Sequence, residues 1–372
     1  MTDAMKRREY LAAGAAVTAG MVAGCMGESE GELRLEDVDQ WPPENYGTNV
    51  TIWNWFTTWR DRIIEHFQDD YPDIESYTLD AYNNPGQFYA AVQGDHSIDS
   101  IGSEGVFTRR MTEEGLLQPL PVDLMDNWDR IEAPIVEASE KYFAKDGEIY
   151  GIPTTRTLIP AIAYHSDYFD EPPDSWSIFW DEEYKNKMVM HDRDYVMSEI
   201  ASWHLYGKQI PDDWDAVEEA LLEQRPLNRT YYQDPNTIIE LMANESILVA
   251  PMAQTWAIIG HETLTDKINV TVPQEGAVYS LDPLIVPKGA PNPIAGAMFA
   301  DYALSDLSAR IYWEEYYATT THENANELKR EFATESEYEV ARWKDEWDLG
   351  PRIPYDSEQR DHLSDIYTAI VG

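Results

Sequence analysis

Residues 276–306 constrain the fold more than any other part of the chain, because they combine two apolar runs, a turn and a capped helix. Residues 277–281 and 284–286 have the composition of buried strands. Residues 287–291 are rich in proline and glycine, which predicts a turn. A helix should then begin after Asn292, a good N-cap residue, with proline as its first residue. This order of elements is typical of an α/β protein.

Asp282 is the unusual residue of this stretch, because it interrupts an otherwise hydrophobic run. It is followed by proline, and an Asp-Pro pair often forms a turn. The alternative is a carboxylate that is held where a strand crosses between two lobes and that faces a ligand. The residues alone leave both interpretations open.

The same stretch resembles the returning strand of extracellular solute-binding proteins of the spermidine/putrescine family, which carry the pattern EG…(aromatic)xxDxLxIPKGAxNPxAAxxFxxFxLS. In that family the strand returns the chain between two lobes, and its Asp pairs with an amine of the ligand. The resemblance therefore implies this role for Asp282. The matching residues are Glu275, Gly276, Tyr279, Asp282, Leu284, Val286 to Ala290, Asn292, Pro293, Ala295, Ala297, Phe299, Tyr302, Leu304 and Ser305.

Two further stretches resemble the same family. Residues 147–155 match GKxYGIPYxxG, and residues 174–192 match PxSWxxLWDPxYKGKVxxxD. The resemblance covers nearly all of the folded body. It implies a two-lobed α/β periplasmic-binding-protein fold of type II, with a hinge of crossing strands and a ligand cleft between the lobes. The expected lobes are 47–153 plus 281–318, and 154–280 plus 319–372.

The matched positions also give candidate ligand-binding residues. Trp55 ends the first predicted strand, where open α/β sheets bind ligands. Either Met252 or Trp256 should replace the tryptophan that relatives carry after the strand at 247–250, and we favour Trp256. The chain departs from polyamine binders at Val106, Tyr195, Ser280 and Thr321, so a smaller organic cation or another polar solute is also open. The complete candidate set is Trp55, Phe107, Thr155, Asp192, Trp256, Tyr279 and Asp282.

Local patterns predict the remaining elements. Residues 50–55, a helix from Thr57 or Thr58 to Tyr71 and residues 74–80 form a β-α-β unit, which favours a parallel pair of strands. The tail, residues 336–372, is predicted to be helical, with Trp343, Trp347 and Ile353 as packing residues.

The charge of the chain excludes nucleic acid as a partner. Its 372 residues include 69 acidic and 27 basic ones, which gives a net charge of −42. Binding to phosphate groups needs Lys and Arg. Acidic residues are scattered along the chain, which indicates a protein adapted to high salt, where repulsion between like charges is screened. An isolated exposed carboxylate therefore carries little functional information.

Residues 1–25 have the features of an export signal: a twin-arginine pattern, an apolar run and a lipobox that ends at Cys25. Such a signal predicts lipidation of Cys25 and attachment to the extracellular face of the cytoplasmic membrane. A buried helix that ends in an incidental cysteine is the alternative. Residues 26–46 are acidic and contain glycine and proline, as expected of a tether.

The enzyme motifs GxGxxG, GxxxxGK[ST] and HExxH are absent from the sequence, and its GxSxG match, residues 27–31, lies in the acidic segment expected to be a tether. With one cysteine and eight isolated histidines, no metal or cofactor is expected. The resemblance to the spermidine/putrescine family, together with the export signal, implies a lipid-anchored receptor that delivers a polyamine or another organic cation to the permease of an ABC importer. A surface hydrolase of glycosides or esters is the alternative, and an adhesion protein is a further one.

Overall fold

Two large β-sheets organise the residues described by this computed structural model, namely 34–82, 85–344 and 347–372. All of them belong to one unit of the chain. The first sheet contains, in spatial order, β13 (Thr319–Thr320), β6 (Ile152–Leu158), β12 (Ala277–Ile285), β3 (Ser100–Gly102), β1 (Asn49–Trp53) and β2 (Ser76–Asp80), with β14 (Leu349–Pro351) beside β12. The second contains β11 (Ile268–Thr271), β7 (Ala161–His165), β10 (Val249–Met252), β8 (Met188–His191) and β9 (Asn228–Tyr232).

The predicted β-α-β unit is confirmed: β1 and β2 pair in parallel, and α2 (Thr57–Asp70) connects them. Trp59, Ile63 and Phe67 of this helix are fully buried, as their spacing on one face indicates. The helix begins at Thr57, and its N-cap residue, Phe56, makes no capping bond through its side chain.

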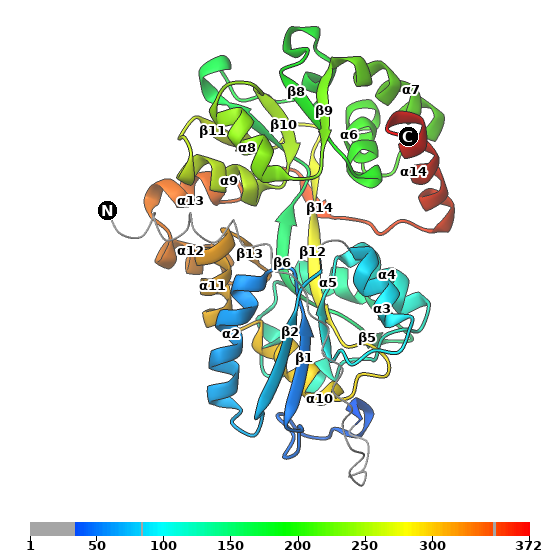
Figure 1. Cartoon of the computed structure of the whole chain (residues 1–372), viewed down its shortest axis with the longest axis vertical. Helices are drawn as coiled ribbons and strands as arrows, with labels where there is room; N and C mark the ends of the chain where they lie inside the picture. The colour runs from blue at the N-terminus through cyan, green and yellow to red at the C-terminus, as the bar shows by residue number, and fades with distance from the viewer. Residues whose placement is uncertain (1–33, 83–84, 345–346) are drawn as a thin grey trace, which may run out of the picture. The chain divides into compact units, whose positions relative to one another are not determined.

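Helices flank each sheet (Figure 1). Beside the first sheet lie α3 (Pro85–Val92), α4 (Gly105–Glu113), α5 (Ala133–Tyr142), α10 (Pro293–Tyr302), α11 (Asp306–Tyr316) and α12 (Ala325–Phe332). Beside the second lie α6 (Asp194–Tyr206), α7 (Trp214–Gln224), α8 (Pro235–Ala243), α9 (Gln254–Thr263) and α14 (Ser357–Ile370). A small hairpin joins β4 (Ala144–Lys145) to β5 (Glu148–Ile149).

Each sheet has its own hydrophobic core. The first core includes Val50, Ile52, Trp59, Phe67, Leu281, Leu284 and Phe299. The second core includes Leu158, Ile162, Met190, Ile200, Met252, Ala277 and Ile366. The boundaries proposed above for the two lobes stay a prediction.

Strands β6 and β12 pass from one core to the other. They pair antiparallel along most of their length, and all nine residues of β12 are buried (Figure 1). Asp282 and Pro283 lie inside β12, where the register of pairing shifts by a residue. The turn interpretation of Asp-Pro is therefore wrong, because Asp282 lies within a strand that contributes to both cores. That its carboxylate faces a ligand stays a prediction.

The predicted all-helical tail is also wrong. Its helices are α13 (Glu335–Ala341) and α14, and β14 lies between them and pairs in parallel with residues 277–279 of β12. Ile353 is 42% exposed and does not pack as expected, whereas the Trp343 ring contacts Tyr279 at 5.2 Å between centroids.

Short 3-10 helices occur at Leu35–Asp37, Val122–Leu124, Trp128–Arg130, Ser166–Tyr168, Trp176–Trp180, Glu182–Tyr184 and Arg225–Leu227.

Candidate ligand-binding site

Asp282 is a buried carboxylate surrounded by hydroxyl groups. Only 6% of the residue is exposed. Thr155 and Thr157 of β6 donate hydrogen bonds to Asp282 Oδ2 at 3.3 and 3.1 Å, and Ser280 donates to Oδ1 at 3.3 Å. These donors face Asp282 because alternate residues of paired strands lie on one face of the sheet. Among the described residues, Asp282 has no cationic partner.

The electrostatic surroundings disfavour the charged form of Asp282. Burial, together with the nearby Glu104 carboxylate, raises the pKa of Asp282 to about 7, although the three hydroxyl donors act in the opposite direction. Buried charges are normally paired with an opposite charge. The arrangement therefore suits a cation that arrives from outside the protein and pairs with this carboxylate.

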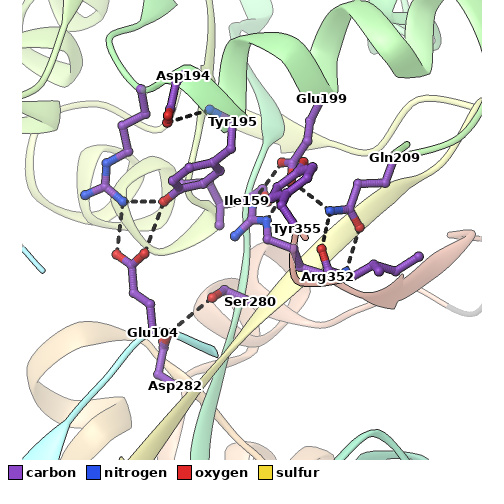
Figure 2. Close-up of polar contacts among 12 residues, drawn as sticks. Glu104, Ile159, Asp194, Tyr195, Glu199, Gln209, Ser280, Asp282, Arg352 and Tyr355 are labelled. Atoms are coloured by element: carbon purple, nitrogen blue, oxygen red, sulfur yellow. Dashed lines mark hydrogen bonds and ion pairs between the residues drawn. The ribbon is translucent and has the colours of Figure 1, made fainter. Parts of the chain in front are cut away.

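Glu104 supplies a second acidic group close to Asp282. It precedes α4, and its side chain is 5% exposed. Arg193 Nη1 donates to Glu104 Oε1 at 3.1 Å, and the Tyr195 hydroxyl donates to Oε2 at 3.2 Å. Arg193 lies between β8 and α6, so these contacts join residues from the sides of both sheets. Figure 2 shows the Glu104 carboxylate pointing toward Tyr195, with Ser280 beside Asp282.

Aromatic rings extend from this acidic pair. Tyr82 is buried, and its hydroxyl donates to the backbone oxygen of Gly102. Burial and the charges of Glu104 and Asp282 raise the pKa of Tyr82 well above its usual value. The Trp55 ring lies 5.8 Å from the Tyr82 ring and is half-buried. Phe107 of α4 packs with Phe88 at 5.7 Å. Trp55 is thus connected to the acidic pair through Tyr82.

None of the hydrogen bonds or ring contacts described for three other predicted residues is with Asp282. Tyr279 faces the opposite side of β12, toward the first core. Asp192 accepts hydrogen bonds from Gln233 Nε2 at 2.8 Å and from the hydroxyl of Tyr367 in α14 at 2.7 Å. Trp256 of α9 is half-buried against the second core. The alternative to Trp256, Met252, is completely buried in that core. Cys25 lies outside the described residues.

Reasoning from sequence missed Glu104, Arg193 and Thr157 as parts of this site. Glu104 directly follows the third strand, where acidic side chains reach the ligand edge of an open sheet, so its position offered a usable signal. Arg193 carried no such signal, because its partner is distant in sequence. Ser280 and Tyr195 were noted only as departures from the family pattern.

A buried ion pair between Arg352 and Glu199 packs against the Tyr195 ring. Arg352 Nε and Nη2 donate to Glu199 of α6 at 2.8 and 2.9 Å, and the Tyr355 hydroxyl donates to the same carboxylate at 2.8 Å. The Arg352 guanidinium lies 4.9 Å from the centre of the Tyr195 ring (Figure 2). The segment after β14 is therefore attached to α6 and contacts the candidate site.

The structure gives no sign of a metal centre in the part of the chain that it describes, since no three His, Cys, Asp or Glu side chains are grouped there in a suitable way. None of the described helices is both long and apolar enough to span a membrane.

Solved structures with the same arrangement of strands define the class of fold. A spermidine/putrescine ABC transporter substrate-binding protein from Streptococcus pneumoniae superposes with a TM-score of 0.73 at 17% identity, and the match covers 87% of this chain and 98% of that one. A lipoprotein of Treponema pallidum gives a TM-score of 0.71 at 17% identity, with 87% and 99% covered. The fold is that of the type II periplasmic binding proteins.

The family follows from the sequence match. Residues 63–337 match the model for bacterial extracellular solute-binding proteins, and this chain belongs to that family. It is 24% identical over 278 residues to the putrescine/agmatine-binding protein of Pseudomonas aeruginosa, covering 69% of this chain and 74% of the relative. Identity to the spermidine/putrescine-binding periplasmic protein of Salmonella typhimurium is 23% over 249 residues, covering 65% and 68%. The chain is therefore a solute-binding protein and not an enzyme.

Proposed function

We propose that this protein is an extracytoplasmic receptor that delivers a polyamine, such as spermidine or putrescine, or another small organic cation to the permease of an ABC importer. One observation carries the proposal: the buried Asp282 carboxylate has no cationic partner among the described residues. The names of the two relatives above and of the Streptococcus pneumoniae protein support the same class of solute.

In this proposal an ammonium group of the solute pairs with Asp282, while the hydroxyl groups of Thr155, Thr157 and Ser280 hold the carboxylate in position. Tyr82 and Trp55 lie beside the acidic pair and offer ring faces to the alkyl chain or to the cation. A cation over an aromatic ring contributes about 0.5–2 kcal/mol. Phe107 belongs to the same aromatic group, at its outer side.

The substitution Asp282→Asn tests the proposed site. It removes the charge and keeps the shape, so we expect it to abolish stabilisation by amines. A ligand at a hundred times its Kd stabilises a protein by about 2.7 kcal/mol, which a thermal melt in high salt detects. Putrescine, spermidine, betaine-like cations, amino acids and sugars form the screen.

Asp212→Asn is the matched control, because this exposed carboxylate pairs only with Lys208 on the surface. It should leave the response to amines unchanged. If only uncharged solutes shift the melt, or if Asp282→Asn responds to amines as the wild type does, the cation site at Asp282 is wrong.

We also propose that lipidation at Cys25 holds the receptor at the outer face of the cytoplasmic membrane. The lipobox before Cys25 supports this, as does the lipoprotein among the similar structures. Cys25→Ser should move the protein from the membrane fraction to the medium and remove labelling by an alkyne-tagged fatty acid. Wild-type protein that is unlabelled and free in the medium would contradict the anchor.

A further inference from the structure

Arg193 is only partly engaged by the protein. Its Nη1 group bonds to Glu104 and, at 2.8 Å, to the Tyr195 hydroxyl. Within the described residues, its Nε and Nη2 groups have no hydrogen-bond acceptor, and 40% of the side chain is exposed. A guanidinium group with free donors at an accessible position can bind a carboxylate in a planar, two-bond arrangement.

The two acidic groups of the site consequently differ. Asp282 has hydroxyl donors alone, so it still lacks a counter-charge. Glu104 already has one, because Arg193 neutralises it and Tyr195 completes its hydrogen bonding. The site therefore has a position for one ammonium group, not for two.

A diamine fits this distribution of charge poorly. When one of its ammonium groups lies at Asp282, the other must approach a carboxylate that is already paired, or the Arg193 guanidinium, which repels it. A solute that carries a carboxylate at its other end meets the free donors of Arg193 instead. The positive charge of Arg193 thus repels the second ammonium group of a diamine and attracts the carboxylate group of the other solute.

We propose that Arg193 is a specificity-determining residue and that it selects a solute with one ammonium group and one carboxylate group, as in an ω-amino acid. The inference rests on the ammonium site proposed at Asp282, and it replaces the polyamine named under the proposed function by an amino acid that carries the same ammonium group and a carboxylate at its other end.

Neighbouring residues hold Arg193 in the required place. Tyr195 accepts a hydrogen bond from it, and Arg352 lies against the Tyr195 ring while its own charge is paired with Glu199. The adjacent Asp194 carboxylate accepts a bond from the backbone N–H of Tyr195 at 2.8 Å. Arg352 and Asp194 therefore stabilise the start of α6 and leave the outer donors of Arg193 available.

A matched set of four-carbon solutes tests the inference: putrescine, 4-aminobutanoate and n-butylamine, titrated by calorimetry into the full-length protein in high salt. We expect 4-aminobutanoate to bind at least about tenfold more tightly than either of the others, since a charge-assisted pair of hydrogen bonds is worth roughly that factor or more.

Three variants isolate the role of Arg193. Arg193→Gln should weaken 4-aminobutanoate binding about tenfold to a hundredfold and strengthen putrescine binding, because Glu104 is then free for a second ammonium group. Arg193→Lys keeps the charge and should preserve the order of the three solutes, which provides a test if the glutamine variant does not fold. Arg310→Gln removes an exposed charge that pairs with Glu314 of the same helix, and should change nothing.

The outcomes separate this inference from the proposed function. Tighter binding of putrescine than of 4-aminobutanoate to the wild type, with the same ratio in Arg193→Gln, would overturn the role of Arg193 and leave the cation site intact. Equal binding of 4-aminobutanoate and n-butylamine would overturn it too. If none of the three solutes binds, the inference fails, while the cation site at Asp282 is decided by the wider amine screen with Asp282→Asn.

Discussion

Asp282 shows how a single residue can link ligand binding to protons. Its pKa of about 7 arises mainly from burial, with a further contribution from Glu104. Near neutral pH the Asp282 carboxyl group is therefore partly protonated when no ligand is bound. An ammonium group beside the carboxylate favours the charged form and lowers this pKa, so binding must displace a proton.

We predict that amine binding at pH 6 releases up to about one proton and that affinity rises as the pH increases from 5 to 8, because primary ammonium groups remain charged throughout this range. Calorimetric titrations in two buffers with different ionisation enthalpies measure the release. Asp212→Asn is the control and should keep the same dependence on pH. An affinity that falls with rising pH would contradict the assignment of Asp282.

The sequence could predict Asp282 because a charge within a hydrophobic strand is a local signal. Tyr279 lies three residues before Asp282 and so faces the other side of β12, which strand alternation gives only when residues 277–285 form one uninterrupted strand. The sequence instead suggested two apolar runs separated by Asp282 and Pro283. Asp192 was expected in the cleft, yet Gln233 and Tyr367 occupy its oxygens. Such partners come from distant segments, and a single sequence gives no means of finding them.

At the scale of the elements, α10 packs closely against the first sheet. Its N-cap residue, Asn292, accepts a bond from Ala295 N–H, and Asn292 N–H donates to Asp99 Oδ1 at 2.6 Å. Gly296 lies one turn further on. A Cβ atom there would stand 2.2 Å from the backbone oxygen of Asp99. The glycine therefore permits a contact between helix and backbone that no other residue allows.

We predict that Gly296→Ala lowers the free energy of unfolding by about 2 to 4 kcal/mol, because backbone atoms cannot move aside as a flexible side chain can. Urea denaturation at constant salt measures the change. Gly94→Ala is the matched control, since its added Cβ would meet its nearest atom at 3.7 Å, an ordinary contact. Equal free energies of unfolding for the two variants would contradict the prediction, because α10 would then accommodate the added methyl group without loss of stability.

Strands and helices with strong local patterns were predicted well, as β1, α2, β12 and α10 show. The tail was not, because β14 exists through pairing with residues 277–279, far away in the chain. Nothing in a helical-looking local pattern reveals such a partner, so tertiary pairing overrode local preference.

At the scale of the whole molecule, the net charge of −42 is the main electrostatic influence on the stability of the folded state. Most of these carboxylates cannot find a basic partner, since acidic residues outnumber basic ones by more than two to one. Their mutual repulsion destabilises the folded state at low ionic strength. Screening shortens the reach of this repulsion from about 10 Å at 0.1 M salt to about 3 Å at 1 M.

We predict that the melting temperature rises by about 5 °C or more between 0.1 and 2 M NaCl. Scanning calorimetry of the purified protein measures it. Sucrose at matched osmolality is the control, because it is excluded from the protein surface yet carries no charge. A melting temperature that is insensitive to salt would exclude the proposed adaptation to high salt.

The order of the strands along the chain has a consequence for synthesis on the ribosome. All strands described for the second sheet lie between residues 161 and 271, whereas the first sheet requires β12, β13 and β14, the last of which ends at Pro351. At about 5–20 residues per second, the ribosome needs roughly 4 to 16 s to proceed from residue 271 to residue 351. During that interval the nascent chain already contains every strand described for the second sheet, while the first sheet receives β12 early and still lacks β13 and β14 until the end.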